Sequence, residues 1–310
     1  MKMKIKTLVL AALLCLLLSS CSAIPGYSEP ENSLVATALG FDPLVDGEGI
    51  RVSVQVSEGA DGKGRRTLSG EGTSIEGAIA SLSASETKRI EYSHVAVVVL
   101  GTGTDGDVIQ KILEFCDKNE EISVSARLIS ADGSEGLLSD GGFSGYELLS
   151  MITSGVGASL SAEDRLYQVL RRGDGVFALP HFASNGEGYE LYGARIYRGG
   201  EGRVILGREE AAIYMMMRGH FRGDPDGASV VESCKTSYGI NRSESGEVTL
   251  RVVCEIKTDE PTDALFDSLR ASMKSLYNTL SSRHGDLFGF AERVGEESFR
   301  VEFECKERGK

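Results

Sequence analysis

The pattern of apolar and polar positions in the first half of the chain predicts several strands. Apolar runs or strict alternation of apolar and polar residues, both typical of strands, occur in four segments: 34–41, 51–57, 95–100 and 122–128. The polar, glycine-rich stretch 58–66 has the composition of a loop. Segment 95–100 has no polar break, which predicts a strand covered on both faces.

Helices are predicted between these strands. Thr73 followed by Glu76 is a capping-box pattern that opens a helix, and Asp105 or Asp107 can cap a second one. The order strand, helix, strand, helix, strand is typical of α/β folds. We therefore expect an N-terminal α/β domain over residues 34–180, built as a mixed sheet flanked by helices.

The pattern changes after residue 180. The apolar run 176–184 is followed by Asn185-Gly-Glu-Gly188, which we interpret as a domain border. The elements predicted beyond it are a hairpin over 191–206, a helix over 209–217, strands at 229–238, 248–256 and 299–305, and a long helix after Pro261-Thr262. Residues 186–310 are thus expected to form an α+β region, with a further split near 224–228. The predicted fold class is α/β to α+β, in two or three small domains, each a mixed sheet flanked by helices.

The first residues have the pattern of an export signal. Lys2, Lys4 and Lys6 precede an apolar stretch at 8–18, which is too short to span a bilayer. Leu18-Ser19-Ser20-Cys21 then reads as a bacterial lipobox, in which the cysteine thiol receives the lipid. We predict a lipoprotein signal peptide at 1–20, lipid attachment at Cys21 and a polar tether at 21–33; an ordinary secretory signal is the alternative.

Composition limits the classes of function. The 310 residues carry a formal net charge of −13, which argues against nucleic acid as a partner. No apolar run long enough for a membrane span occurs after the N-terminal stretch. The acidic chain would gain nothing from anionic headgroups, so membrane attachment would depend on acyl chains.

The sequence holds no catalytic signature. Four histidines are scattered without metal-ligand spacing, and neither a nucleophile elbow nor a P-loop occurs. Gly101-Thr-Gly-Thr-Asp-Gly106 formally matches a dinucleotide motif, but strands precede it, and we interpret it as a plain turn. Ser93 and His94 are expected on opposite faces of a strand and therefore not as a dyad. We predict a protein that is not an enzyme and takes no metal or cofactor.

Four cysteines follow Cys21. Cys254 and Cys305 fall on the apolar side of their predicted strands and could meet in one core, and Cys234 could compete for either. A disulfide among Cys234, Cys254 and Cys305 and free buried thiols are both open. Cys116 is expected in the core of a helical segment.

Four features of the chain occur in an order that is similar to that of a known family. They are Cys21 with the strand 34–42 ending in Gly-x-Asp; Glu71-Gly72 and 75–82 running into Tyr92-Ser-His-Val95; the helix and charged turn 109–122; and Leu179-Pro180 with 193–197, 205–207 and Glu209-Glu210. In this order they resemble the Ger(x)C family of spore germination lipoproteins, the C subunit of nutrient germinant receptors. Members commonly carry two Trp residues, whereas this chain has none.

The resemblance implies a non-catalytic subunit needed for the germination response. It implies anchoring at the outer leaflet of the spore inner membrane and partnership with integral-membrane A- and B-type receptor subunits. The alternative is a substrate-binding lipoprotein of a transporter, with two α/β lobes hinged near 179–188. That alternative predicts a deep cleft between the lobes, lined by aromatic residues.

Overall fold

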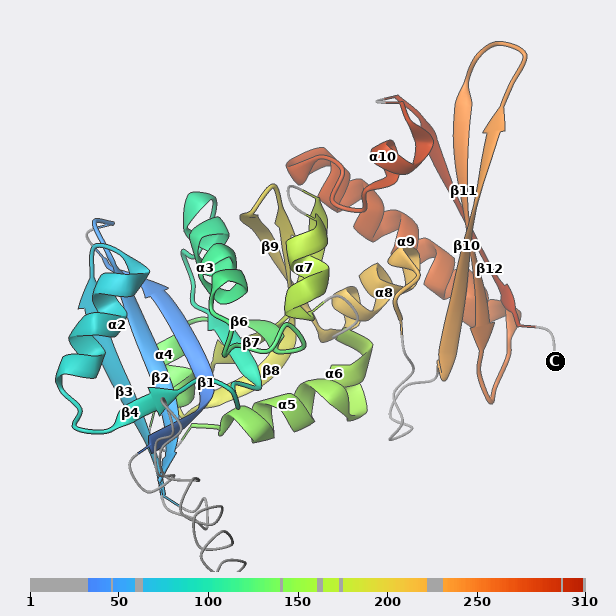
Figure 1. The fold of residues 1–310 in the computed structure, drawn as a ribbon. Coiled ribbons are helices and arrows are strands. Elements are labelled where there is room, and N and C mark those ends of the chain that lie inside the picture. The colour runs from blue at the N-terminus through green and yellow to red at the C-terminus, as the bar shows by residue number, and fades with distance from the viewer. Residues whose placement is uncertain are drawn as a thin grey trace, which may run out of the picture.

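A nine-stranded mixed sheet forms the larger part of the protein (Figure 1). The computed structural model describes residues 33–45, 47–58, 64–139, 142–160, 164–172, 175–221, 231–296 and 298–308. The strands of this sheet are β1 (Ser33–Pro43), β2 (Ile50–Glu58), β3 (Gly64–Gly72), β4 (Arg89–Glu91), β5 (Val97–Leu100), β6 (Arg127–Ala131), β7 (Val176–Ser184), β8 (Tyr189–Arg198) and β9 (Glu201–Gly207). The predicted mixed α/β architecture is confirmed.

The centre of the sheet is parallel and both sides are antiparallel. The strand order is β3-β2-β1-β5-β6-β7-β8-β9, with β4 paired to β1. Neighbours among β1, β5, β6 and β7 run parallel, whereas β2 and β3 on one side and β8 and β9 on the other are joined antiparallel. Strands at the centre are therefore covered on both faces, and all four residues of β5 are buried.

Helices cover both faces of the large sheet. On one face lie α2 (Ile75–Ala84), α3 (Asp107–Lys118) and α7 (Leu166–Arg172). On the other lie α4 (Ser134–Leu138), α5 (Gly145–Thr153), α6 (Gly155–Leu160) and α8 (Arg208–Arg218). The strand period of two separates the two cores: Val97 and Val99 pack on the α5 side, and Val98 and Leu100 on the α3 side.

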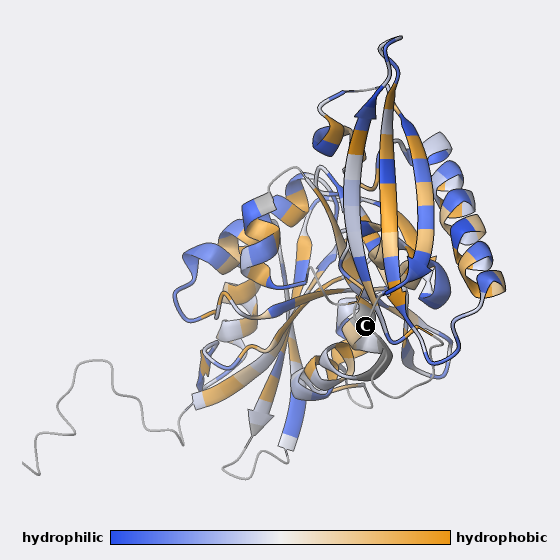
Figure 2. Ribbon diagram, turned by 90° about the vertical axis from the view of Figure 1, so that its right-hand side faces the viewer, coloured by the Kyte–Doolittle hydropathy of each residue, from blue (hydrophilic) through white to orange (hydrophobic). Residues whose placement is uncertain are grey.

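A second, three-stranded sheet follows. It consists of β10 (Ser233–Arg242), β11 (Val248–Lys257) and β12 (Arg300–Glu307), with β10 antiparallel and β12 parallel to β11. The helices α9 (Asp263–His284) and α10 (Phe290–Val294) cover its apolar face. Figure 2 shows the alternation of hydrophilic and hydrophobic residues along these strands, which leaves the outer face polar.

Helix α8 joins the two sheets through one continuous core. Its Met215, Met216 and Met217 are all buried in the core cluster that extends from the large sheet to β11 and α9. The methionine triplet is thus part of the core that the two sheets share. The hydroxyls of Thr236 and Tyr238 donate to the carbonyls of Met216 and Met217, so β10 satisfies the last turn of the helix.

The predicted domain border near 180–188 does not coincide with a change of sheet. It falls in β7 and the turn to β8, and both strands belong to the large sheet. The chain passes from the large sheet to the small one later, between the end of α8 and the start of β10. The further split predicted near 224–228 falls between these two elements. Antiparallel pairing across a short turn explains this, because a hairpin extends a sheet rather than ending it.

Three local predictions need correction. Strand β3 begins at Gly64, inside the stretch 58–66 that was predicted to be a loop. Its sequence is polar and glycine-rich because it is an edge strand. Residues 122–126 form turns, and the strand begins only at Arg127. The cap of α2 is Ser74, whose Oγ accepts from the Gly77 N–H at 3.1 Å, rather than Thr73.

Candidate functional site

The predicted lipid-attachment residue Cys21, the signal peptide 1–20 and all of the tether but Ser33 lie outside the described residues. The described fold begins at Ser33, in the first strand of the large sheet. None of the described helices combines the length and the apolarity needed to cross a membrane.

The end of β1 is fixed by a carboxylate. Both oxygens of Asp42 accept hydrogen bonds at the start of α4: from the Ser134 N–H at 2.9 Å, the Ser134 hydroxyl at 2.6 Å and the Glu135 N–H at 3.0 Å. A side chain on Gly40 or Gly101 would collide with this junction, since its Cβ would lie 2.5 Å from Ser134 Oγ or 1.8 Å from Asp42 Oδ1. The Gly-x-Asp strand end is therefore a capping device.

The glycine-rich loop 101–106 is occupied by contacts within the protein. The Asp105 carboxylate accepts from the Gly202 N–H at 2.7 Å and pairs with Arg195 at 3.2 Å, so it ties the loop to the β8–β9 hairpin. The Thr104 hydroxyl donates to the Phe41 carbonyl at 3.3 Å. These contacts fit the interpretation as a plain turn. They correct the prediction that Asp105 or Asp107 caps α3, because its N-cap is Gly106, without a side-chain cap.

A polar row crosses the buried centre of the sheet. His181 Nδ1 lies 3.1 Å from Ser130 Oγ, and its Nε2 lies 3.4 Å from Asp132 Oδ1. Both Ser130 and His181 are almost fully buried, and burial lowers the pKa of His181. The group types are those of a catalytic triad, but a hydroxyl with no exposed surface cannot meet a substrate. A histidine inside the apolar run 176–184 was the sequence signal for this row.

Ser93 and His94 correct a prediction. They lie in an exposed turn before β5, not on a strand, and Ser93 Oγ is 3.0 Å from His94 Nδ1. The alternation argument fails here because it holds only for strand backbone. A hydroxyl and an imidazole thus form a hydrogen-bonded pair at the surface, and among the described residues no third group contacts the imidazole to orient it.

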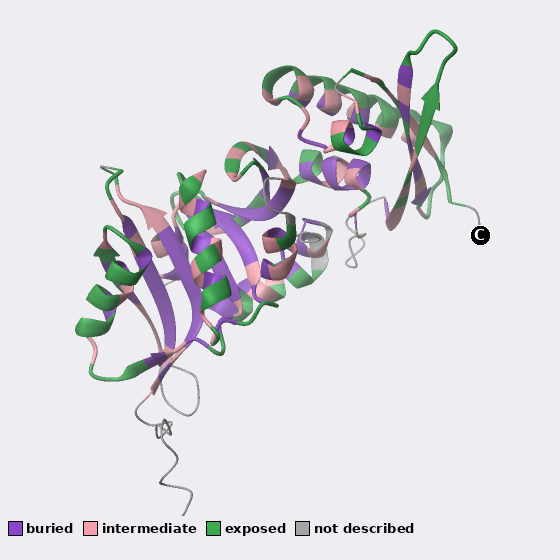
Figure 3. Cartoon of the chain, turned by 45° about the horizontal axis from the view of Figure 1, so that its top comes forward, coloured by how far each residue is buried: buried purple, intermediate pink, exposed green. Residues whose placement is uncertain are grey.

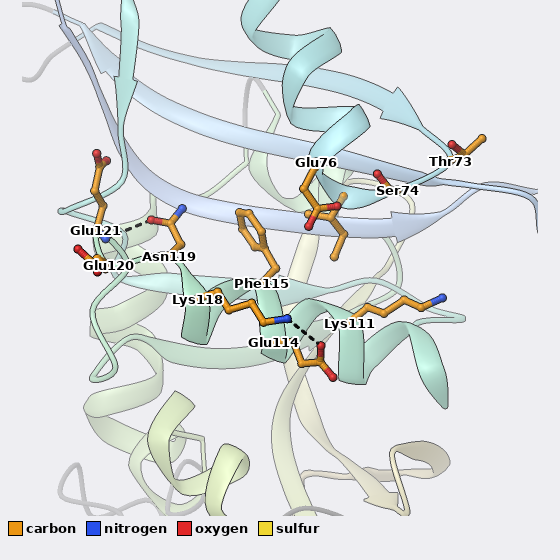
Figure 4. A pocket seen from close by; sticks show the side chains of 11 residues that line it. Thr73, Ser74, Glu76, Lys111, Glu114, Phe115, Lys118, Asn119, Glu120 and Glu121 are labelled. Atoms are coloured by element: carbon orange, nitrogen blue, oxygen red, sulfur yellow. Dashed lines mark hydrogen bonds and ion pairs between the residues drawn. The ribbon is translucent and has the colours of Figure 1, made fainter.

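A groove of about 760 Å³ lies between the start of α2 and α3 (Figure 4). Phe115 lies on the sheet side of α3, where its ring packs edge-on against Phe41 with centroids 6.2 Å apart. Charged residues of both signs line much of the rest: Glu76 from α2, and Lys111, Glu114, Lys118, Glu120 and Glu121 from α3 and the turn after it. Thr73, Ser74, Ile75 and Asn119 complete the lining. A lining of this kind is suited to polar contacts rather than to an apolar ligand.

Part of the groove's charge is already paired. Lys118 Nζ lies 3.2 Å from Glu114 Oε2, one helical turn away. Glu121 pairs with Arg89 and accepts from the Tyr92 N–H at 3.0 Å, which ties the turn after α3 to β4. The outer surfaces of α2 and α3 are otherwise exposed (Figure 3). The groove lies within one helix layer. The substrate-binding lipoprotein of a transporter would instead bind its ligand in a cleft between two lobes.

Three cysteine side chains meet under α9. Cys254 and Cys305 are paired in register on β11 and β12, and Cys234 lies on the adjoining strand β10. The strand parity of Cys254 and Cys305 was predicted correctly. All are free thiols in the structure, as is the buried Cys116. No group of three or more His, Cys, Asp and Glu side chains that could hold a metal ion occurs among the described residues.

The comparison with protein families decides the identity of the chain. Residues 26–180 match the family model described as the spore germination protein N-terminal domain, which covers half of the sequence. The chain belongs to the Ger(x)C family of spore germination proteins. Among solved structures, the "Crystal Structure of the GerBC protein" is 14% identical, with 86% of this chain and 96% of that chain covered and a TM-score of 0.46. No curated protein matches the sequence.

The segments that resemble the Ger(x)C family occupy structural junctions. Asp42 caps α4, as described above. On β8, a Cβ at Gly193 would lie 2.0 Å from the Leu206 carbonyl oxygen of β9, so the close approach of the two strands requires glycine there. Arg195 of the same motif pairs with Asp105 in the loop 101–106, and the Tyr197 ring stacks on Phe177. Asp42, Gly193, Arg195 and Tyr197 therefore hold elements of the fold together.

Proposed function

We propose that this protein is the membrane-anchored, non-catalytic lipoprotein subunit of a spore nutrient germinant receptor, needed for the germination response. The observation that carries the proposal is the match of residues 26–180 to the spore germination family. The partners we propose are integral-membrane A- and B-type receptor subunits. Its place is the outer leaflet of the spore inner membrane.

Attachment through lipid at Cys21 is supported by the sequence Leu18-Ser19-Ser20-Cys21. The segment from Cys21 to Ser33 spans at most about 40 Å when fully extended, so the large sheet would stay close to the bilayer. A net charge of −13 gives no electrostatic attraction to anionic lipid, and the acyl chains would supply the affinity.

A non-catalytic role is supported by how the reactive side chains are used. The Asp42, Asp105 and Asp132 carboxylates each accept backbone N–H groups, and His181 is buried. Each of these groups holds one element of the large sheet to another. The chemistry they perform is capping and pairing rather than acid–base transfer.

Labelling with a fatty acid tests the anchor. We expect the wild-type chain to incorporate the label and to fractionate with membranes, and the Cys21→Ala variant to lose both, since no thioether can form. Cys15→Ala is the matched control, because Cys15 follows a bulky residue instead of two small ones and should keep its label. Label on Cys21→Ala, or its loss from Cys15→Ala alone, would rule out Cys21 as the attachment site.

A further inference from the structure

The three thiols under α9 are not equivalent. Thr236 Oγ1 lies 3.6 Å from the sulfur of Cys234 and 3.6 Å from that of Cys254, so the two sulfurs flank one hydroxyl. The thioether sulfur of Met273 lies 3.7 Å from Cys305 Sγ and 4.0 Å from Cys254 Sγ. Cys254 is fully buried, whereas Cys234 and Cys305 are half-buried.

We propose that Cys234 and Cys254 are a redox pair, which forms a disulfide across β10 and β11 by exchange with an external disulfide. Cys234 is the attacking thiol and Cys254 the resolving thiol. Cys305 is paired in register with Cys254 but is the bystander, because the shared Thr236 hydroxyl contacts the sulfurs of Cys234 and Cys254.

The roles follow from exposure and from the effect of each thiol on the other. The neighbouring Cys254 thiol lowers the pKa of Cys234. The same interaction raises the pKa of Cys254, and burial raises that of Cys305 to about 11. Cys234 is therefore the thiol that combines access with thiolate character, the two properties that determine reactivity.

The exchange balances in two steps. The Cys234 thiolate attacks one sulfur of an external disulfide, RSSR; an S–S bond forms, and RS⁻ leaves and takes up a proton. Cys254 then loses its proton, attacks the Cys234 sulfur and expels the second RS⁻. Once Cys234 is a neutral mixed disulfide, it no longer raises the pKa of Cys254, which favours this step. The protein loses two electrons and two protons, and RSSR is reduced to two RSH.

Peptide mapping after oxidation with glutathione disulfide tests the proposal on the full chain. Trypsin separates the three cysteines, since Lys235, Arg251, Lys257, Arg300 and Lys306 lie between or beside them. We expect the Cys234 and Cys254 peptides to become linked, with a mass lower by two hydrogen atoms, and the Cys305 peptide to remain free. Cys116, whose pKa burial raises to about 12, should also remain unmodified.

Two variants separate the steps. Cys254→Ser should stop at a stable glutathione adduct on Cys234, and the matched control Cys305→Ser should form the link at the wild-type rate. A Cys254–Cys305 link, glutathione retained on wild-type Cys234, or no reaction at all would overturn the proposal. The wild-type map decides this even if a variant fails to fold. The test does not involve Cys21, so its outcome is independent of the anchor.

Discussion

At the scale of single residues, polar side chains in this protein hold elements together. Both carboxylate oxygens of Asp42 accept hydrogen bonds at the start of α4. Asp105 joins the loop 101–106 to Arg195 and Gly202. Negative charge at a helix N-terminus is stabilising, and a buried carboxylate needs such donors. The family-like motif around Gly40-Phe41-Asp42 is thus explained by packing and capping.

His181 predicts a pH dependence of stability. Its pKa is lowered by burial, so below about pH 6.5 the unfolded chain takes up a proton on this imidazole more readily than the folded protein does. Stability should therefore fall as the pH is lowered through that value. Urea titrations at pH 7 and pH 5 should show a smaller loss in His181→Gln than in the wild type.

The exposed His94 is the control for this experiment. His94→Gln makes the same change in a surface turn, and the loss of stability in His181→Gln should be smaller than in this variant. The raised pKa of Asp164, about 6, acts in the opposite direction in all three proteins and cancels in the comparison. An equal loss in His181→Gln and wild type would show that His181 is not the buried neutral group described.

How far residue roles could be predicted depended on whether a local rule applied. The burial of Cys116 and the shared parity of Cys254 and Cys305 followed from periodicity. The Ser130–His181–Asp132 row did not, because it joins residues fifty positions apart on neighbouring strands. Side-chain partners across a parallel sheet depend on strand order, which the sequence does not state locally.

At the scale of elements, long periodic segments were predicted correctly and irregular ones were not. The long helix begins at the predicted Thr262 cap, whose Oγ1 accepts from the Leu265 N–H at 3.1 Å, and its buried side carries Met273, Leu276 and Leu280. Strand β3 was missed because an edge strand with one face against α2 needs little apolar sequence. Alternation misled at 122–126, where Val124 is exposed.

The contact between α8 and β10 gives a prediction at this scale. The Tyr238 hydroxyl donates to the Met217 carbonyl at 2.8 Å, while its ring packs under Arg293. Tyr238→Phe keeps the ring and removes the donor, so it should lower the free energy of unfolding by about 1 kcal/mol. The measurement is urea denaturation of the full chain.

Tyr192→Phe is the matched control for that variant. Tyr192 is 46% exposed, and loss of its hydroxyl should change stability by less than about 0.5 kcal/mol. Equal stability of Tyr238→Phe and the wild type would mean that water replaces this donor. The Tyr238 hydrogen bond would then contribute nothing to the docking of the small sheet on α8.

At the scale of the whole molecule, one core runs from the large sheet through α8 to the small sheet. This continuity explains why the expected border near 180–188 is not a change of sheet. The sequence signalled a turn there, and turn residues do not distinguish a hairpin within a sheet from a domain boundary. The mixed α/β class was predictable, because element order alone sets it.

The function that we propose requires this Ger(x)C protein to work beside membrane-embedded receptor subunits. The most direct measurement is affinity purification of the tagged chain from spore membranes, with bound proteins identified by mass spectrometry. We predict that A- and B-type subunits are recovered with the wild type and strongly reduced with Cys21→Ala. Recovery of the wild-type chain from membranes without either subunit would contradict the account.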